Sequence, residues 1–146
     1  MGLAELDSGT SVYLDTNVWI YAIEGYPAYA GILKALLQRI DQKTLLAVTS
    51  DLALAEVLVK PMADARVDLQ EAYETALQSG RNLNITPITR SILSEAARLR
   101  AQYPTLKLPD AIHAATAISA RCNYFVSNDR RFAGLRDLTV LPLSHL

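Results

Sequence analysis

The chain has 146 residues, of which 51% are hydrophobic and 20% are charged. This composition is typical of a globular protein and excludes disordered, collagen-like and low-complexity classes. Lys and Arg total 14 against 15 Asp and Glu, so the net charge of -1 at pH 7 excludes a simple basic protein that coats nucleic acid. The length predicts one domain over residues 1–146.

The first half of the chain predicts strands that alternate with helices. A β-branched and aromatic run at 11–15 predicts a buried strand, which a short helix follows. Apolar residues at helical spacing predict a longer helix over about 27–43, and the run 45–49 predicts a second strand. The next helix begins near Asp51, and its apolar face continues until Pro61.

The second half continues the alternation. Its predicted elements are a helix over 63–79, a strand near a sheet edge over 84–88, helices over 89–103 and 109–121, and strands over 124–127 and 138–141. Strands that alternate with helices form a parallel sheet with right-handed crossovers and helices on both faces. The sequence therefore predicts an α/β fold, a three-layer α/β/α sandwich around a small central parallel sheet.

The cysteine content and the apolar runs indicate where the protein resides. Cys122 is the single cysteine, so it forms no intramolecular disulfide, and a reducing cytoplasm is the expected compartment. The N-terminal residues lack the basic region and the long apolar core of a signal peptide, and no apolar run is long enough to cross a bilayer. We therefore expect a soluble cytoplasmic protein with no membrane partner.

Four acidic residues are predicted at one edge of this sheet. Asp15 and Asp129 follow two of the predicted strands, while Glu56 and Asp110 lie in the early turns of two helices. Crossover helices run antiparallel to the strands, so their N-termini lie at the carboxyl edge of the sheet, where open parallel sheets place their sites. If the strands that precede Asp15 and Asp129 are neighbours, the four carboxylates converge.

Converging carboxylates repel one another unless positive charge lies among them. No Lys or Arg stands immediately beside Asp15, Glu56 or Asp110 in the sequence, so a divalent cation is the expected partner. Mg²⁺ and Mn²⁺ accept carboxylate oxygens and leave positions for a substrate phosphate. Such a cation polarises a phosphoryl oxygen and activates water for attack on phosphorus, which predicts phosphodiester hydrolysis. Arg130 and Arg131 are expected to contact substrate phosphates.

Each acid also has an ordinary structural interpretation. Asp15 and Asp110 can stabilise helix N-termini, Glu56 can pair with a lysine one turn later, and Asp129 can close a turn after its strand. The presence of all four at one edge favours catalysis. His113 lies three residues after Asp110, but a histidine in an alanine-rich helix is more often buried or hydrogen-bonded than catalytic, so its role stays open.

Four segments stand in a fixed order along the chain: Tyr13–Tyr21 (YLDTNVWIY), Leu54–Val57 (LAEV), Leu108–Ala117 (LPDAIHAATA) and Val126–Phe132 (VSNDRRF). In this order they resemble the motifs of the PIN-domain ribonucleases, particularly the VapC-like toxins of bacterial toxin–antitoxin pairs. The resemblance covers nearly the whole chain, although the region 61–104 carries no matching motif.

This resemblance implies a Mg²⁺- or Mn²⁺-dependent endoribonuclease that cuts RNA, forms a homodimer and is inhibited by a small antitoxin protein. The antitoxin's tail is expected to fill the acidic groove. The resemblance also implies roles for particular residues. The implied metal-binding and catalytic acids are Asp15, Glu56, Asp110 and Asp129, and the polar residues implied to support them by hydrogen bonds are Asn17 and Ser127.

Two other functions stay open. An aspartyl phosphatase uses a nucleophilic aspartate after its first strand, but it normally needs a second acid two residues later, where this chain has Asn17. A non-catalytic RNA- or protein-binding module would keep the fold alone. The four intact acids argue against such a module, and binding of Mg²⁺ or Mn²⁺ distinguishes it from the nuclease.

Overall fold

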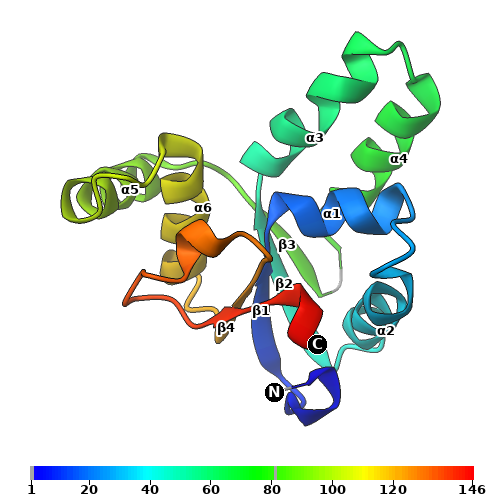
Figure 1. Ribbon diagram of the computed structural model, residues 1–146, viewed down its shortest axis with the longest axis horizontal. Coiled ribbons are helices and arrows are strands. Elements are labelled where there is room, and N and C mark those ends of the chain that lie inside the picture. Colours follow the sequence, from blue (N-terminus) through cyan, green and yellow to red (C-terminus); the bar gives the residue numbers. More distant parts are fainter. Residues whose placement is uncertain (1, 81) are drawn as a thin grey trace.

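The structure is a computed structural model that describes residues 2–80 and 82–146. In this part of the chain five parallel strands form one sheet in the order β3-β2-β1-β4-β5 (Figure 1). The strands are β1 (Thr10–Leu14), β2 (Leu45–Ser50), β3 (Leu83–Thr86), β4 (Tyr124–Val126) and β5 (Val140–Leu141). The predicted small parallel sheet is therefore confirmed, and β3 is one of its edges.

Helices cover both faces of the sheet. The α-helices among the described residues are α1 (Thr16–Ile23), α2 (Ala30–Asp41), α3 (Leu52–Ala63), α4 (Val67–Ala76), α5 (Arg90–Gln102) and α6 (Leu108–Ser119). Helices α1 and α2 lie on one side of the sheet and α5 and α6 on the other, while α3 and α4 extend away from the body as a pair (Figure 1). This arrangement confirms the predicted three-layer sandwich. Three short 3-10 helices that the sequence analysis did not predict are η1 (Leu3–Glu5), η2 (Arg130–Phe132) and η3 (Leu143–His145).

The central strand β1 supplies alternate side chains to two separate hydrophobic cores. Val12 and Leu14 belong to the core under α1 and α2, whereas Tyr13 belongs to the core under α5 and α6. All three side chains are fully buried. Successive residues of a strand point to opposite faces, so a run without polar interruption indicates a strand that is covered on both sides.

The pairing of β1 with β4 places the two strand ends that matter for the site next to each other. Leu14 pairs with Val126 in parallel register, and the N–H of Asp15 donates to the carbonyl of Val126 at 3.2 Å. Strand order reverses at this pair, because β2 and β3 extend the sheet on one side and β5 extends it on the other. Ligands of open α/β sheets bind in the crevice at such a reversal.

The predicted boundary between the two helices around Pro61 was wrong. Helix α3 continues through Pro61 to Ala63, because a proline in the last turn removes only one backbone hydrogen bond, and Pro61 is buried. The next helix begins at Val67 and not at residue 63, because Ala65 adopts a positive φ of 53° that interrupts the helical backbone.

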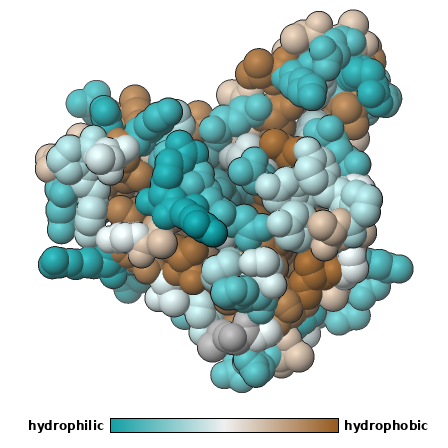
Figure 2. Space-filling view, in the orientation of Figure 1, coloured by the Kyte–Doolittle hydropathy of each residue, from teal (hydrophilic) through white to brown (hydrophobic). Residues whose placement is uncertain are grey.

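The surface combines hydrophilic and apolar areas. In Figure 2, strongly hydrophilic side chains gather over the segment that carries η2, whereas apolar side chains appear on the α3–α4 pair. Val59, Met62 and Val67 are the exposed hydrophobic residues of that pair. Among the described residues, no helix combines the length and the apolar character that crossing a membrane requires.

Candidate active site

Asp15 stands directly after β1 and is the N-cap of α1. Its Oδ1 accepts a hydrogen bond from the N–H of Thr16 at 2.8 Å, and its Oδ2 accepts one from the Oγ–H of Ser127 at 2.6 Å. Burial raises the pKa of Asp15, and the hydrogen bonds from Ser127 and Thr16 offset that rise only in part. The carboxylate is therefore held in one orientation, but its ionised form is costly without a further positive partner.

Ser127 connects Asp15 to Asp129. It lies just after β4 and is 2% exposed; its Oγ donates to Asp15 and accepts a hydrogen bond from the N–H of Asp129 at 3.0 Å. Asp129 also caps η2, because its Oδ1 accepts a hydrogen bond from the N–H of Arg131 at 2.9 Å. Asn17, in contrast, is exposed and makes no hydrogen bond to the four acids within the described chain.

Glu56 reaches the same edge from the second turn of α3. Its Oε1 accepts hydrogen bonds from the Oγ1–H of Thr16 at 2.8 Å and from Nε2 of His113 at 2.5 Å. Burial alone would raise the pKa of Glu56, but the hydrogen bond and charge of His113, the hydrogen bond from Thr16 and the charge of Arg131 outweigh it, so the pKa lies below its ordinary value. The carboxylate is therefore ionised at neutral pH. The contacts of Thr16 and His113 with Glu56 were missed by the sequence analysis.

Asp110 lies in the first turn of α6 and is the acid with the least satisfied carboxylate. Its Oδ2 is buried and has no hydrogen-bond partner in the described chain, although Nη1 of Arg131 lies 3.1 Å away. The two charges are close, but they are not aligned as a hydrogen bond. Burial, together with the charges of Asp129 and Asp15, raises the pKa of Asp110 despite the opposing charge of Arg131. A buried acceptor without a donor marks a place for a missing partner.

Arg131 is the cation that stands among these acids. Its Nη2 pairs with Oδ2 of Asp129 at 2.5 Å and its Nη1 with Oδ2 of Asp110, and its charge also lowers the pKa of Glu56. The sequence analysis favoured a divalent cation over Lys or Arg as the partner of Asp15, Glu56 and Asp110, whereas in the structure Arg131 lies beside Asp110. Adjacency in the sequence did not reveal the contact, because η2 turns Arg131 back over the first turn of α6.

The donor set fits a divalent cation by its chemistry. Carboxylate oxygens, with the hydroxyls of Ser127 and Thr16 around them, are the ligands that Mg²⁺ and Mn²⁺ prefer, and Oδ2 of Asp110 still lacks a partner. As the side chains stand, no three acidic, histidine or cysteine residues of the described ranges are close enough together to hold a metal ion. The guanidinium of Arg131 lies between Asp110 and Asp129, so these two acids hold an internal cation in this state.

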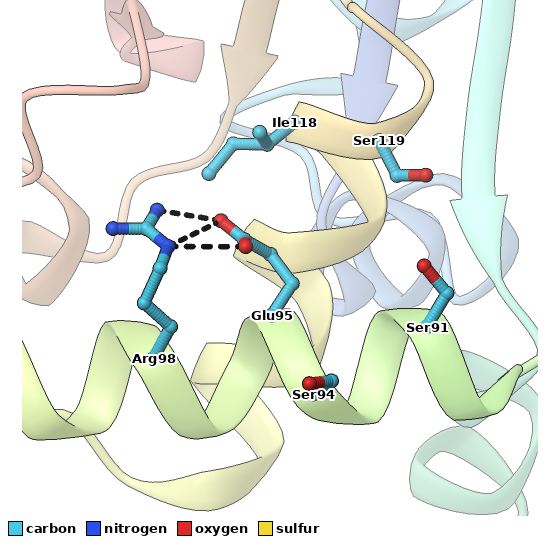
Figure 3. A pocket seen from close by; sticks show the side chains of 6 residues that line it. All are labelled: Ser91, Ser94, Glu95, Arg98, Ile118 and Ser119. Atoms are coloured by element: carbon cyan, nitrogen blue, oxygen red, sulfur yellow. Dashed lines mark hydrogen bonds and ion pairs between the residues drawn. The ribbon is translucent and has the colours of Figure 1, made fainter.

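A separate hollow of about 430 Å³ lies between α5 and α6 (Figure 3). It is lined by Ser91, Ser94, Glu95, Arg98, Ile118 and Ser119. Arg98 donates to both carboxylate oxygens of Glu95 and also pairs with Asp137, so the charged groups there satisfy one another. None of the four acids lines this hollow, and we do not assign it to the candidate active site.

Comparison with known proteins identifies a family. The sequence profile of the PIN domain family matches residues 12–138. No curated protein matches the sequence significantly.

Several solved structures have the same fold. A chain in the crystal structure of VapBC2 from Rickettsia felis, bound to a DNA fragment from its promoter, has a TM-score of 0.74 and 19% identity and covers 91% of this chain and 98% of that chain. A chain in a toxin–antitoxin complex from Klebsiella pneumoniae has a TM-score of 0.68 and 26% identity, with 92% and 99% covered. VapC20 from Mycobacterium tuberculosis, a Sarcin-Ricin loop cleaving toxin, has a TM-score of 0.65 and 17% identity, with 88% and 98% covered. At their identities the first and third of these establish the fold alone.

Replacement of Asp110 by Asn tests whether its buried charge destabilises the metal-free protein. Burial raises the pKa of Asp110, so the folded state binds the proton more tightly than the unfolded state, and stability falls as pH rises through the raised pKa. The cost is therefore greater at pH 7 than at acidic pH. We therefore expect Asp110→Asn to raise the Tm by a few degrees in buffer with EDTA, as measured by differential scanning fluorimetry.

Asp68 supplies a control, because its pKa is shifted in the direction opposite to that of Asp110. A hydrogen bond from Arg66 lowers the pKa of this exposed acid to about 2, so its charge stabilises the folded state. Asp68→Asn should leave the Tm unchanged or lower it slightly. A clear drop in the Tm of Asp110→Asn would contradict the description of Asp110 as an under-compensated buried charge.

Replacement of Arg131 tests whether its guanidinium competes with a divalent cation. Removing one positive charge beside the carboxylates should strengthen Mn²⁺ binding by about 1 kcal/mol, which is roughly fivefold in Kd. Arg131→Met can be compared by isothermal titration calorimetry with Arg130→Met, which removes the neighbouring exposed arginine that makes no ion pair with these acids in the described chain. Equal Kd values for the two variants would exclude the competition.

Proposed function

The chain belongs to the PIN domain family, and from this premise we propose that it is a metal-dependent endoribonuclease and the toxin of a toxin–antitoxin pair. The observation that carries the proposal is the buried Oδ2 of Asp110, which has no hydrogen-bond donor in the described chain and whose carboxyl group is repelled by the charges of Asp129 and Asp15. Such an arrangement lowers the stability of the folded protein, and in a nuclease a bound cation would compensate the buried negative charge.

In this proposal the cation is Mg²⁺ or Mn²⁺. When bound, it supplies the positive charge that polarises a phosphodiester and makes water nucleophilic. The residues that would hold it are Asp15, Glu56, Asp110 and Asp129. Ser127 keeps the Asp15 carboxylate in its orientation through the 2.6 Å hydrogen bond, and Asn17, which is exposed at the start of α1, is proposed as a further supporting residue.

RNA is the proposed substrate, either single-stranded or structured. A hollow of about 460 Å³ borders Asp129 on the side of β5, and Tyr29, Asn128 and Arg130 are among its other lining residues. An aromatic ring and an arginine at such a hollow suit a base and a phosphate, respectively. Arg131 would contact a phosphate once it has left the acids. Support for RNA also comes from the VapC20 neighbour, a Sarcin-Ricin loop cleaving toxin with the same fold.

The proposed partners are a cognate antitoxin protein and a second copy of the chain. The Klebsiella pneumoniae neighbour, at 26% identity, is part of a toxin–antitoxin complex, and this supports an antitoxin as the partner here. We propose that residues 1–146 form one domain that acts in the cytoplasm.

One observation favours a second candidate, a non-catalytic RNA- or protein-binding module. Arg131 already pairs with Asp110 and Asp129, and a protein that had no use for a cation could keep the acids in this form. The nuclease is favoured because Arg131 is half exposed and leaves Oδ2 of Asp110 without an aligned donor. Thermal shifts with Mg²⁺ or Mn²⁺ separate the two candidates, since the module predicts none.

Cleavage of RNA by the Asp15→Asn variant tests the proposed function. The amide keeps the shape of the side chain but removes the charge that would hold the cation. Loss of outer-shell partners of a metal typically costs 10- to 100-fold, so loss of a ligand should reduce cleavage by more than about 100-fold. The measurement is sequencing of the RNA ends that the purified protein produces with Mn²⁺, together with growth arrest on expression in a bacterium.

Asp51→Asn is the matched control. Asp51 lies at the same sheet edge, just before α3, but it is exposed and its side chain makes no hydrogen bond in the described chain. This variant should cleave RNA and arrest growth like the wild type. Full cleavage by Asp15→Asn would contradict the proposal. The absence of Mn²⁺-dependent cleavage by the wild type, on both unstructured and hairpin RNA, would contradict it as well.

A further inference from the structure

A chain of buried polar groups lies beneath Glu56. Tyr13, at the centre of β1, is fully buried, and His113, on α6, is 2% exposed. Oη of Tyr13 and Nδ1 of His113 are 2.6 Å apart, and the N–H of Ser50 donates to the same Oη at 3.1 Å. Two polar side chains so deep in an apolar core are expensive unless each hydrogen bond is made.

These contacts determine how the protons are arranged. Oη of Tyr13 accepts from the N–H of Ser50 and shares one hydrogen bond with Nδ1 of His113. Oε1 of the ionised Glu56 can only accept a hydrogen bond, so Nε2 of His113 carries a proton. This N–H is the donor that reaches Oε1 of Glu56.

Both donors that reach Glu56 converge on one of its two oxygens. Nε2 of His113 lies 2.5 Å from Oε1, and the Oγ1–H of Thr16 donates to the same atom at 2.8 Å. No hydrogen bond from the described residues ends on Oε2. The carboxylate is thus anchored through one oxygen while the other stays available.

The anchor itself is rigid. The ring of Tyr13 stacks on Phe125 of β4 with a centroid distance of 4.9 Å and an interplanar angle of 10°, and it meets the His113 ring edge-on at 5.9 Å. Glu56, in contrast, lies on the projecting helix α3, and its side chain is 34% exposed. A long, partly exposed glutamate would sample several rotamers, and the buried chain restricts it to one.

We propose that His113 is a positioning residue, held by Tyr13, that fixes the Glu56 carboxylate so that its free oxygen is ready to take a divalent cation. The inference rests on the proposed function and assigns to His113 and Tyr13 a role in forming the cation site. In metal sites, the carboxylates that bind the metal are themselves oriented by hydrogen-bond donors, and His113 would be such a donor to Glu56.

Binding of Mn²⁺ alone to purified variants tests the inference without any measurement of cleavage. His113→Leu removes the donor, and we expect Kd to weaken by about 10- to 100-fold, the range found for lost outer-shell partners. His113→Gln places an amide N–H close to the position of Nε2 and should restore Kd to within a few-fold of the wild type. Tyr13→Phe removes the hydroxyl that orients the imidazole and should give an intermediate Kd. Isothermal titration calorimetry, with the electron paramagnetic resonance of free Mn²⁺ as a second readout, gives these values.

Thr116→Val is the matched structural control. Thr116 is fully buried on the same helix, but its hydroxyl donates to the carbonyl of Ile112 and does not touch the acids. Its replacement should leave Kd unchanged. If His113→Leu does not fold, as judged by circular dichroism and thermal melting, the comparison of His113→Gln and Tyr13→Phe with the wild type decides the question.

The outcomes separate this inference from the proposed function. If the wild type binds Mn²⁺ and Asp15→Asn does not, but folded His113→Leu binds like the wild type, the positioning role is overturned and the nuclease proposal stands. Equal weakening in His113→Gln and His113→Leu overturns the role as well, because the donor would then not matter. If the wild type binds no Mn²⁺, the proposed function fails and this inference fails with it.

Discussion

Repulsion between carboxylates at the carboxyl edge of the sheet is the constraint on which the rest of the site depends. The edge brings these groups together because parallel strands end there and crossover helices begin there. Asp15 and Asp129 arrive from neighbouring strands, and Glu56 and Asp110 arrive from helices. The charges of Asp15 and Asp129 raise the pKa of Asp110, and hydrogen-bond donors and the guanidinium of Arg131 offset part of this repulsion.

The four carboxylates are stabilised in different ways. Asp15 is held by two aligned donors, from Ser127 and Thr16, whereas Asp110 has a charged neighbour but no aligned donor for its Oδ2. Asp15 is therefore ordered in advance, whereas Oδ2 of Asp110 is left without a hydrogen-bond donor in the described chain. Such a difference suits a site that must keep its shape and still exchange one cation for another.

The two faces of the sheet contribute differently to the site. The core under α1 and α2 is mainly apolar, whereas the core under α5 and α6 contains the buried pair of Tyr13 and His113, which reaches out to the partly exposed Glu56. A buried polar chain that is fully satisfied specifies one arrangement of side chains more strictly than apolar packing does. In this protein it connects the central strand to the projecting helix α3, which otherwise reaches the site from outside the body.

The sequence by itself determined the alternation of strands and helices, the parallel sheet and the places of the four acids. These are local properties. The hydrophobic periodicity of a segment indicates which element it forms, and the position of an acid relative to that element indicates at which end it lies. Tertiary structure alone decided that Arg131 reaches Asp110 and that His113 reaches Glu56, which lies 57 residues earlier in the chain. No local pattern encodes such contacts, because they depend on which helix faces pack together and on how a short turn such as η2 directs one side chain.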